Sequence, residues 1–184
     1  MCDKYEESQN QRVARDFRKY ITERQTVMLA TVNEDGTPNV SYAPFVIDEL
    51  LNVYIFVSEI VERTQNLMSN GKASLLFIED EQDAKYIFAR RRATMQVKAE
   101  VLSSEEANSP KFKAMFEEKF GDFVNLELAG KSDFRLIKLV PYEGGLTKGF
   151  GLAFKLTGQN LQKVEHLKKG HTSSDMKEQE NGAA

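Results

Sequence analysis

The chain has 184 residues, of which 41% are hydrophobic and 29% are charged, a composition typical of one globular domain with a full core. Its 25 Lys and Arg against 28 Asp and Glu give a net charge of -3, which excludes the global basic field that drives nonspecific binding to nucleic acid. No apolar run approaches the roughly 20 residues of a membrane-spanning helix. The polar N-terminus does not resemble a secretory signal. These features predict a cytoplasmic protein with no membrane span and no nucleic-acid partner.

The first predicted element is a helix near the N-terminus. Val13, Phe17, Tyr20 and Ile21 fall at positions i, i+4, i+7 and i+8, which form one apolar stripe on a helix. Charged residues surround this stripe. We therefore expect the helix to pack its apolar face on the rest of the domain.

Residues 27–47 predict a β-hairpin, because an Asp-Gly pair separates two runs of β-favouring, largely apolar residues. Both faces of the first run, residues 27–32, are mostly apolar, which predicts a central strand covered on both sides. Pro38 and Pro44 each remove an amide donor from the second run. The second strand is therefore expected at a sheet edge or in an irregular segment, where a ligand can approach the backbone.

Four further elements are predicted before residue 121: a strand at 53–57, a helix from a Ser58 cap to Asn70-Gly71, a strand at 73–79, and a helix that begins at Ser109-Pro110. Residues 92–101 show the clearest alternation of apolar and polar side chains in the chain. Because successive side chains of a strand point to opposite faces, one face should be core and the other solvent or a binding surface.

The C-terminal part of the chain is rich in glycine. A predicted strand at 134–140 precedes Pro141, and four glycines follow between residues 144 and 151. Glycine inside a strand marks a bend or another body close to the backbone, and that body could be a ligand. Leu161, Val164 and Leu167 predict a last short helix that ends at Gly170. Residues 172–184 have no apolar content to order them and are predicted to be a disordered tail after a single domain at 1–171.

Taken together, the elements predict an α+β fold built on an antiparallel barrel, because six or seven mostly consecutive strands accompany three or four helices. The apolar character of both faces of the first strand and of residues 53–57 also predicts burial by a second copy of the chain. We therefore expect a homodimer.

Few residues are suited to chemistry. The chain has no GxSxG, HExxH or P-loop motif, and its single cysteine, Cys2, allows neither a disulfide framework nor a thiolate metal site. It has only two histidines, His166 and His171, and the simpler interpretation makes both surface residues. Alternatively, Gly170 ends the last helix in a left-handed turn and leaves His171 on an arm that can reach a ligand.

A run of arginines at 90–92 is the second candidate site. Charge runs usually form a solvated edge that discourages strand pairing. However, alternate arginines on one strand face, Arg90 and Arg92, would present forked donors that suit carboxylates or phosphates. Asp133 precedes a strand and is either a turn residue or a carboxylate that supports a metal-bound imidazole. The sequence leaves these alternatives open.

Several segments together resemble the bacterial haem-utilisation proteins of the HutZ and HugZ kind, members of the pyridoxamine 5′-phosphate oxidase-like split-barrel superfamily. The similar segments are LATVNEDGTPNVSYAPFV, ASLLFIEDEQDAKYIFARRRATM, SDFRLIKLVP, TKGFGLAF and HLKKGH, and the resemblance runs from about residue 17 to residue 171. The IEDE, FARRR and GFG to HLKKGH segments are more specific than the opening, which is common in split barrels.

This resemblance implies a homodimeric antiparallel split barrel with flanking helices that binds haem near the dimer interface. It further implies that His171 is the axial iron ligand, that Asp133 accepts a hydrogen bond from that imidazole, and that Arg92 lies near the haem. Close relatives have a histidine in the segment where this chain has Glu59 and Arg63, so a polar helper is missing there.

The residue inventory agrees with haem. One neutral imidazole, a flat apolar slot and cations for two propionates are needed, and these assignments fall on His171, on Phe150 and Phe154, and on Arg90, Arg92 and Lys148.

The first functional hypothesis is oxidative opening of the haem ring with release of iron, which requires an electron donor. An FMN-dependent oxidoreductase is the alternative, with Ser58, Arg63 and Thr64 near the phosphate. A haem carrier without turnover is the third hypothesis, since it would use the same ligands.

Overall fold

The computed structural model describes residues 8–121 and 133–167. Its strands are β1 (Thr26–Val32), β2 (Pro38–Ile47), β3 (Val53–Ser58), β4 (Lys72–Ile78), β5 (Arg92–Val101), β6 (Phe134–Thr147), β7 (Ala153–Thr157) and β8 (Lys163–His166). Its helices are α1 (Gln9–Thr22), α2 (Glu62–Asn70), α3 (Ser104–Ala107) and α4 (Pro110–Phe120), and 3-10 turns lie at Glu81–Asp83, Ile87–Ala89 and Gln159–Leu161.

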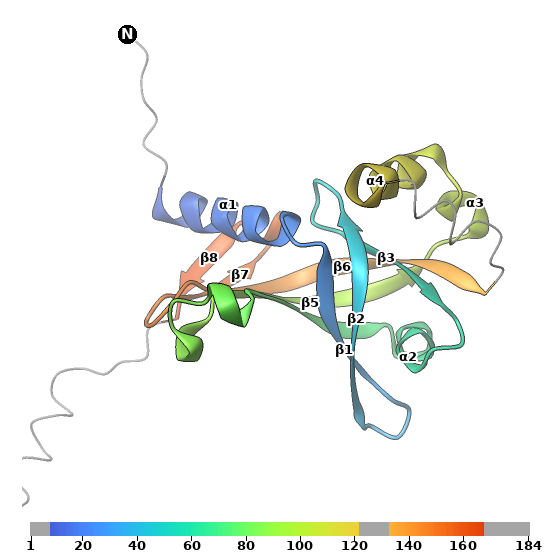
Figure 1. Cartoon of the computed structure of the whole chain (residues 1–184), viewed down its shortest axis with the longest axis horizontal. Helices are drawn as coiled ribbons and strands as arrows, with labels where there is room; N and C mark the ends of the chain where they lie inside the picture. The colour runs from blue at the N-terminus through green and yellow to red at the C-terminus, as the bar shows by residue number, and fades with distance from the viewer. Residues whose placement is uncertain (1–7, 122–132, 168–184) are drawn as a thin grey trace, which may run out of the picture.

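The strands form an antiparallel barrel. They follow the order β3, β2, β1, β4, β5, β6, and the pairing of β6 with β3 closes the ring (Figure 1). The other half of β6 extends beyond the barrel and carries β7 and β8 as additional strands. The predicted α+β antiparallel barrel is therefore confirmed.

The N-terminal helix forms as its apolar stripe predicts. Ser8 caps α1 through a capping box with Gln11, which satisfies amide donors at the start of the helix. All four residues of the stripe are buried, and α1 packs on β8 and β5. The helix thus covers the end of the sheet where β7 and β8 lie (Figure 1).

The hairpin has the predicted turn, but its second strand is not at an edge. Gly36 takes a left-handed φ of 86°, and its amide donates to the carbonyl of Asn33. β2 pairs with β1 up to Pro44 and with β3 from Phe45 onward. Pro44 is tolerated inside the sheet because it stands where one pairing ends and the next begins.

The first strand is central, between β2 and β4, but only one of its faces is covered within a single chain. Val27, Leu29 and Thr31 are buried, whereas Met28 is 48% exposed and Val32 is 44% exposed. Among the described helices, α4 packs on the outside of β2 at Val46, but Val40 and Tyr42 of β2 stay more than half exposed. The prediction of burial on both faces is therefore wrong for one chain.

The core consists of two clusters. The larger fills the barrel and the space beneath α1, and the smaller lies between α4 and the outside of the barrel. The buried members of the smaller cluster are Val46, Tyr54, Phe112, Phe116 and Leu136. As predicted, the apolar face of β5 points inward, and Ala93, Met95 and Val97 have no exposed area.

Two local predictions are wrong near helix ends. The predicted last helix is a 3-10 turn at Gln159–Leu161 followed by β8, because Asn160 and Leu161 both take positive φ, which a right-handed helix excludes. The residues of β8 instead complete a ladder with β7. Ser58 does not cap α2, which begins at Glu62 after Val61, although Gly71 ends this helix as predicted.

The strand predicted to stop before Pro141 continues through it to Thr147. A register shift between Gln96 and Val97 on β5 lies opposite this proline, so the ladder is irregular there and accommodates the missing amide. β6 is consequently long enough to run from the α3 end of the molecule to the β7 and β8 end (Figure 1). Candidate site residues lie next to both ends of β6, with Asp133 before its first residue and Lys148 after its last.

Candidate functional site

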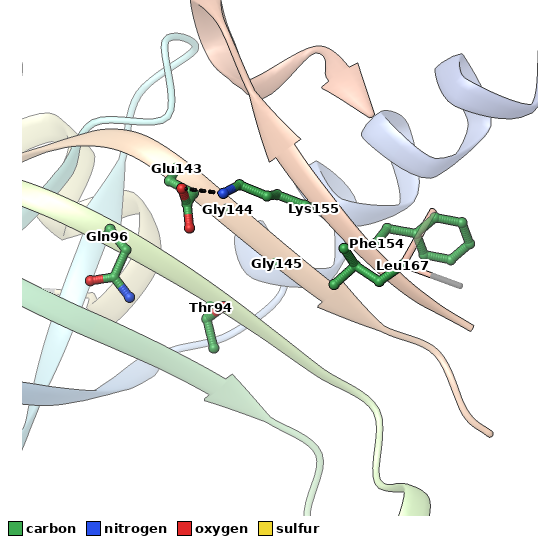
Figure 2. Close-up of a pocket in the computed structure, with 8 residues that line it drawn as sticks. All are labelled: Thr94, Gln96, Glu143, Gly144, Gly145, Phe154, Lys155 and Leu167. Carbon is green, nitrogen blue, oxygen red and sulfur yellow. Dashed lines mark ion pairs between the residues drawn. The ribbon is translucent and has the colours of Figure 1, made fainter. Parts of the chain in front are cut away.

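The outer face of β5, β6 and β7 carries a polar hollow of about 220 Å³. Thr94 lies opposite Gly145, which lies opposite Lys155, and Gln96 lies opposite Glu143, so these side chains share one face of the sheet. Figure 2 shows these residues around the hollow, with Leu167 at its border. The alternation of β5 therefore produces a core on one side and an open polar surface on the other.

Two glycines of β6 are required by close packing. A Cβ at Gly145 would lie 2.6 Å from the Thr94 hydroxyl oxygen, and a Cβ at Gly144 would lie 3.0 Å from the ring of Phe17. The groups close to this backbone are therefore side chains of the protein itself, Thr94 on one face and Phe17 on the other. The glycines allow α1 to pack closely and keep the floor of the hollow low.

An ion pair crosses the hollow. The Lys155 ammonium and the Glu143 carboxylate are 2.8 Å apart on neighbouring strands (Figure 2). The hydrogen bond from Lys155 to Glu143 raises the pKa of the lysine. The hollow thus contains both a donor and an acceptor at its surface.

The two candidate arginines have different surroundings. Arg92 begins β5 on the same face as Thr94, and its guanidinium donates to the carbonyl oxygen of Arg90 at 3.2 Å. Arg90 precedes the strand and does not share its face. Its guanidinium donates twice to the Glu79 carbonyl oxygen and pairs with the Glu81 carboxylate at 3.1 Å, so it ties the β4–β5 loop together.

Lys148 and Phe150 lie in the turn between β6 and β7. Lys148 pairs with Asp16 of α1 at 2.5 Å, and this hydrogen bond lowers the pKa of the aspartate. Phe150 is 68% exposed, and its ring centroid is 6.1 Å from that of Tyr86 in the β4–β5 loop. The turn therefore presents an open aromatic ring, while its lysine connects β6 to α1.

Phe154 is buried and stacks on His166, with ring centroids 4.7 Å apart and planes at 22°. A nitrogen of the His166 ring lies 2.8 Å from the carbonyl oxygen of Gly151, so this imidazole closes the β6–β7 turn. His166 thus has a structural position in β8. His171, Gly170, Cys2 and the predicted tail at 172–184 lie outside the described residues.

Asp133 lies at the opposite end of β6. Its carboxylate accepts a hydrogen bond from the Ser58 hydroxyl at 2.6 Å, and its carbonyl accepts one from the Glu59 amide at 2.7 Å. Glu59 in turn pairs with Arg135 at 2.7 Å. One carboxylate of this group is therefore already oriented by the end of β3.

The structure brings Arg92, Lys148, Phe150 and Phe154 to the β7 and β8 end, at or just after the Thr147 end of β6, but leaves Asp133 just before the Phe134 end. A strand rises about 3.3 Å per residue, so the two ends of β6 are roughly 40 Å apart along the strand. Among the described residues no group of three metal-ligating side chains lies together. No described helix is both long and apolar enough to cross a membrane.

The sequence interpretation missed an exposed aromatic segment in the β4–β5 loop. Tyr86, Ile87 and Phe88 are all more than half exposed, and Phe88 is 91% exposed. The signal was the apolar triplet between an acidic turn and three arginines, since apolar residues in a polar loop need a partner. Val40 and Tyr42 of β2 likewise join Met28 and Val32 in an exposed apolar face.

Comparison with known proteins identifies the family. The pyridoxamine 5′-phosphate oxidase family model matches residues 13–148, and the chain belongs to this family of split barrels.

Particular relatives are more informative. The chain is 36% identical over 160 residues to the heme oxygenase HutZ of Vibrio cholerae serotype O1, an alignment that covers 87% of this chain and 90% of the relative.

Two solved structures are also similar. A structure of Vibrio cholerae HutZ, described as a heme storage protein, has a TM-score of 0.64 and 32% identity, with 73% of this chain and 94% of that chain covered. Campylobacter jejuni ChuZ has a TM-score of 0.76 and 29% identity, with 91% of this chain and 68% of that chain covered.

FMN is a cofactor that the fold family implies, and of the three residues proposed for its phosphate, Arg63 and Thr64 each have a buried donor with no hydrogen-bond partner among the described residues, while Ser58 and Thr64 are not open to a ligand. The Ser58 hydroxyl is donated to Asp133, and the Thr64 side chain has no exposed area. Glu59, Glu62 and Asp133 place carboxylates around the same segment, where a phosphate dianion would meet like charges. No step of a mechanism is therefore assigned to a flavin.

Proposed function

We propose that this protein binds haem and oxidatively opens its ring, releasing iron for use by the cell. The observation that carries the proposal is the β7 and β8 end of the sheet, where Arg92 begins β5 opposite Thr147, the exposed Phe150 ring lies in the following turn, and Leu167 borders the hollow on the sheet. A flat apolar macrocycle with two carboxylates needs this combination of groups. The likeness to a heme oxygenase and to a heme storage protein supports haem as the ligand.

We assign the axial imidazole to His171. Leu167 donates its amide to the Ala153 carbonyl at 2.8 Å and so fixes where the chain leaves the sheet. The next four residues span at most about 14 Å, which keeps His171 within reach of the Arg92 and Phe150 surface of its own chain. Haem is both bound group and substrate, and its iron supplies the redox chemistry with dioxygen and an electron donor.

The proposed partner of this imidazole, Asp133, must come from a second chain. Asp133 is held roughly 40 Å along β6 from the β7 and β8 end, well beyond the reach of His171 in the same chain. The exposed apolar face of β1 and β2 gives a second chain a surface to cover, because contiguous exposed apolar faces mark interaction sites. We therefore propose a homodimer in which each site combines His171, Arg92 and Phe150 of one chain with Asp133 of the other.

In this arrangement each residue has a defined role. Asp133, oriented by Ser58, accepts the imidazole N–H and keeps His171 basic. Arg92 binds a propionate through charge-assisted hydrogen bonds, and Lys148 adds positive charge nearby. Arg90 holds the β4–β5 loop, and Phe154 supports the turn below the ligand. A reductant is needed for turnover, so we place the activity in the cytoplasm.

The test is a titration of the protein with haemin, followed by ascorbate in air with catalase present. The proposal predicts a sharp Soret band at one haem per chain, which then decays to a biliverdin-like absorbance with release of iron. A Soret band that persists would make the protein a carrier and contradict the oxygenase. A protein that binds FMN but not haemin would contradict the whole proposal.

A further inference from the structure

The base of the β4–β5 loop is closed by several hydrogen bonds. The Glu79 amide donates to the Arg91 carbonyl at 3.0 Å, and the Glu79 carboxylate accepts from the Arg91 amide at 2.6 Å. The Tyr20 hydroxyl of α1 also donates to the Arg91 carbonyl, at 2.8 Å. With the contacts of Arg90, these bonds fix the loop on the sheet before any ligand binds.

This loop presents its apolar residues to solvent. Tyr86, Ile87 and Phe88 project from it, and the Tyr86 ring lies beside the Phe150 ring of the β6–β7 turn, with centroids 6.1 Å apart. We call these four residues the aromatic wall. Exposing them costs free energy that burial against an apolar ligand would recover.

One cation lies beside the aromatic wall, and a second lies at the base of its loop. The Lys85 ammonium lies 5.2 Å from the centre of the Tyr86 ring, and Arg92 follows the base of the loop at the start of β5. An apolar surface with cations at its edge matches a flat apolar molecule that carries carboxylates. The wall has four side chains, far fewer than the roughly 20 residues that each partner contributes to a stable protein interface, so a second protein is a poorer fit.

We propose that the aromatic wall is the surface against which one face of the haem macrocycle packs, with Lys85 as a second partner for its carboxylates. This inference rests on the proposed function and adds residues that the sequence interpretation did not assign. The wall excludes water from one side of the ring and slows release of the ligand. It acts in binding and does not contact iron through a ligating atom.

The test compares Phe88→Ser with Leu50→Ser in the full-length protein. Leu50 is 55% exposed and lies in the turn between β2 and β3, outside both the aromatic wall and the Ser58 to Asp133 contact, which makes it a matched control. Haemin is loaded, and its transfer to excess apomyoglobin is followed at 25 °C. Phe88→Ser should release haem at least about tenfold faster, as expected from the loss of a buried phenylalanine contact, while Leu50→Ser should match wild type.

Sedimentation and the fluorescence of a hydrophobic dye on the haem-free protein complete the test. The proposal expects Phe88→Ser to bind less dye and to sediment as wild type does. If Phe88→Ser releases haem at the wild-type rate, with or without a weakened dimer, the aromatic wall does not bind haem. That result would leave the proposed function intact. A wild-type protein that takes up no haemin would instead overturn the proposed function itself.

Discussion

The two ends of β6 differ in what they offer a ligand. At the Asp133 end, charged side chains are engaged with one another, as in the Ser58 to Asp133 hydrogen bond and the Glu59 to Arg135 pair. At the Thr147 end, aromatic rings stand open beside Arg92. At the Asp133 end, a complete polar network therefore orients a carboxylate. At the Thr147 end, apolar rings remain exposed and can bind a partner. Neither end alone would complete the proposed haem site.

The largest effect should come from removing the proposed axial ligand. His171→Ala removes the only iron-ligating group assigned to the open end, so the Soret band should shift and haem affinity should fall sharply. His166→Ala is the matched control, because His166 is engaged by Phe154 and Gly151. It should keep the wild-type position of the Soret band. Loss of that band in His166→Ala alone would reverse the assignment.

A smaller effect is expected from substitution of Asp133. Asp133→Asn keeps a similar shape but is a weaker acceptor for an imidazole N–H, and loss of such a partner typically costs about 10 to 100-fold in activity or affinity. The mutant should still bind haem and degrade it more slowly, as measured by decay of the Soret band with ascorbate. Wild-type rates in Asp133→Asn would remove this residue from the site.

Burial of a lysine makes a stability prediction at the α4 end. The Lys119 ammonium lies 3.7 Å from the centre of the Phe45 ring and has no hydrogen-bond partner among the described residues. Burial lowers the pKa of Lys119 from 10.5 to about 8, so the folded state carries an unfavourable charge below about pH 8. As pH rises from about 8 toward 10.5, the folded protein releases this proton first and the penalty is relieved.

Lys119→Met should therefore raise the unfolding midpoint in urea at pH 7, and the gain should shrink above about pH 8. The matched control is Lys113→Met, an exposed lysine of the same helix, which should change little. A gain that is independent of pH would show that shape, and not charge, is responsible.

The smallest effect is expected from the ion pair between Lys148 and Asp16, which connects the β6–β7 turn to α1. Lys148 lowers the pKa of Asp16, so the pair stabilises the fold above the ordinary aspartate pKa of 3.8 and the stabilisation is lost as pH falls through the lowered value. Because both side chains are partly exposed, Lys148→Met should cost less than about 1 kcal/mol at pH 7. In urea titrations the difference from wild type should vanish in strong acid.

Several elements were predictable from local pattern. The hairpin around Gly36, the alternation of β5 and the apolar stripe of α1 appear where their residues indicate. In α1 and β5 the spacing of apolar residues in the sequence matches the buried face of the element in the structure. The last helix failed because Leu161 and Val164 fit helical spacing, while the positive φ at Asn160 and the ladder with β7 are set by tertiary structure.

The site was predictable as a list of residue types but not as an arrangement. The resemblance singled out Arg92 and Asp133, and the needs of haem added Phe150, yet nothing in their spacing shows that a single long strand holds Asp133 far from the other two. The engagement of Arg90 within its loop likewise depends on a carbonyl eleven residues away in sequence. Such contacts follow from the closed barrel and cannot be read from a local window.

One measurement tests the two-chain site most directly: the iron–imidazole stretching frequency of a mixed dimer made from a His171→Ala chain and an Asp133→Asn chain. Only the second chain keeps His171, so the dimer should bind one haem, next to the native Asp133 of its partner. The account predicts the wild-type frequency for this haem, distinct from that of the Asp133→Asn homodimer. A frequency equal to that of the Asp133→Asn homodimer would show that the carboxylate acts within its own chain and would contradict the account.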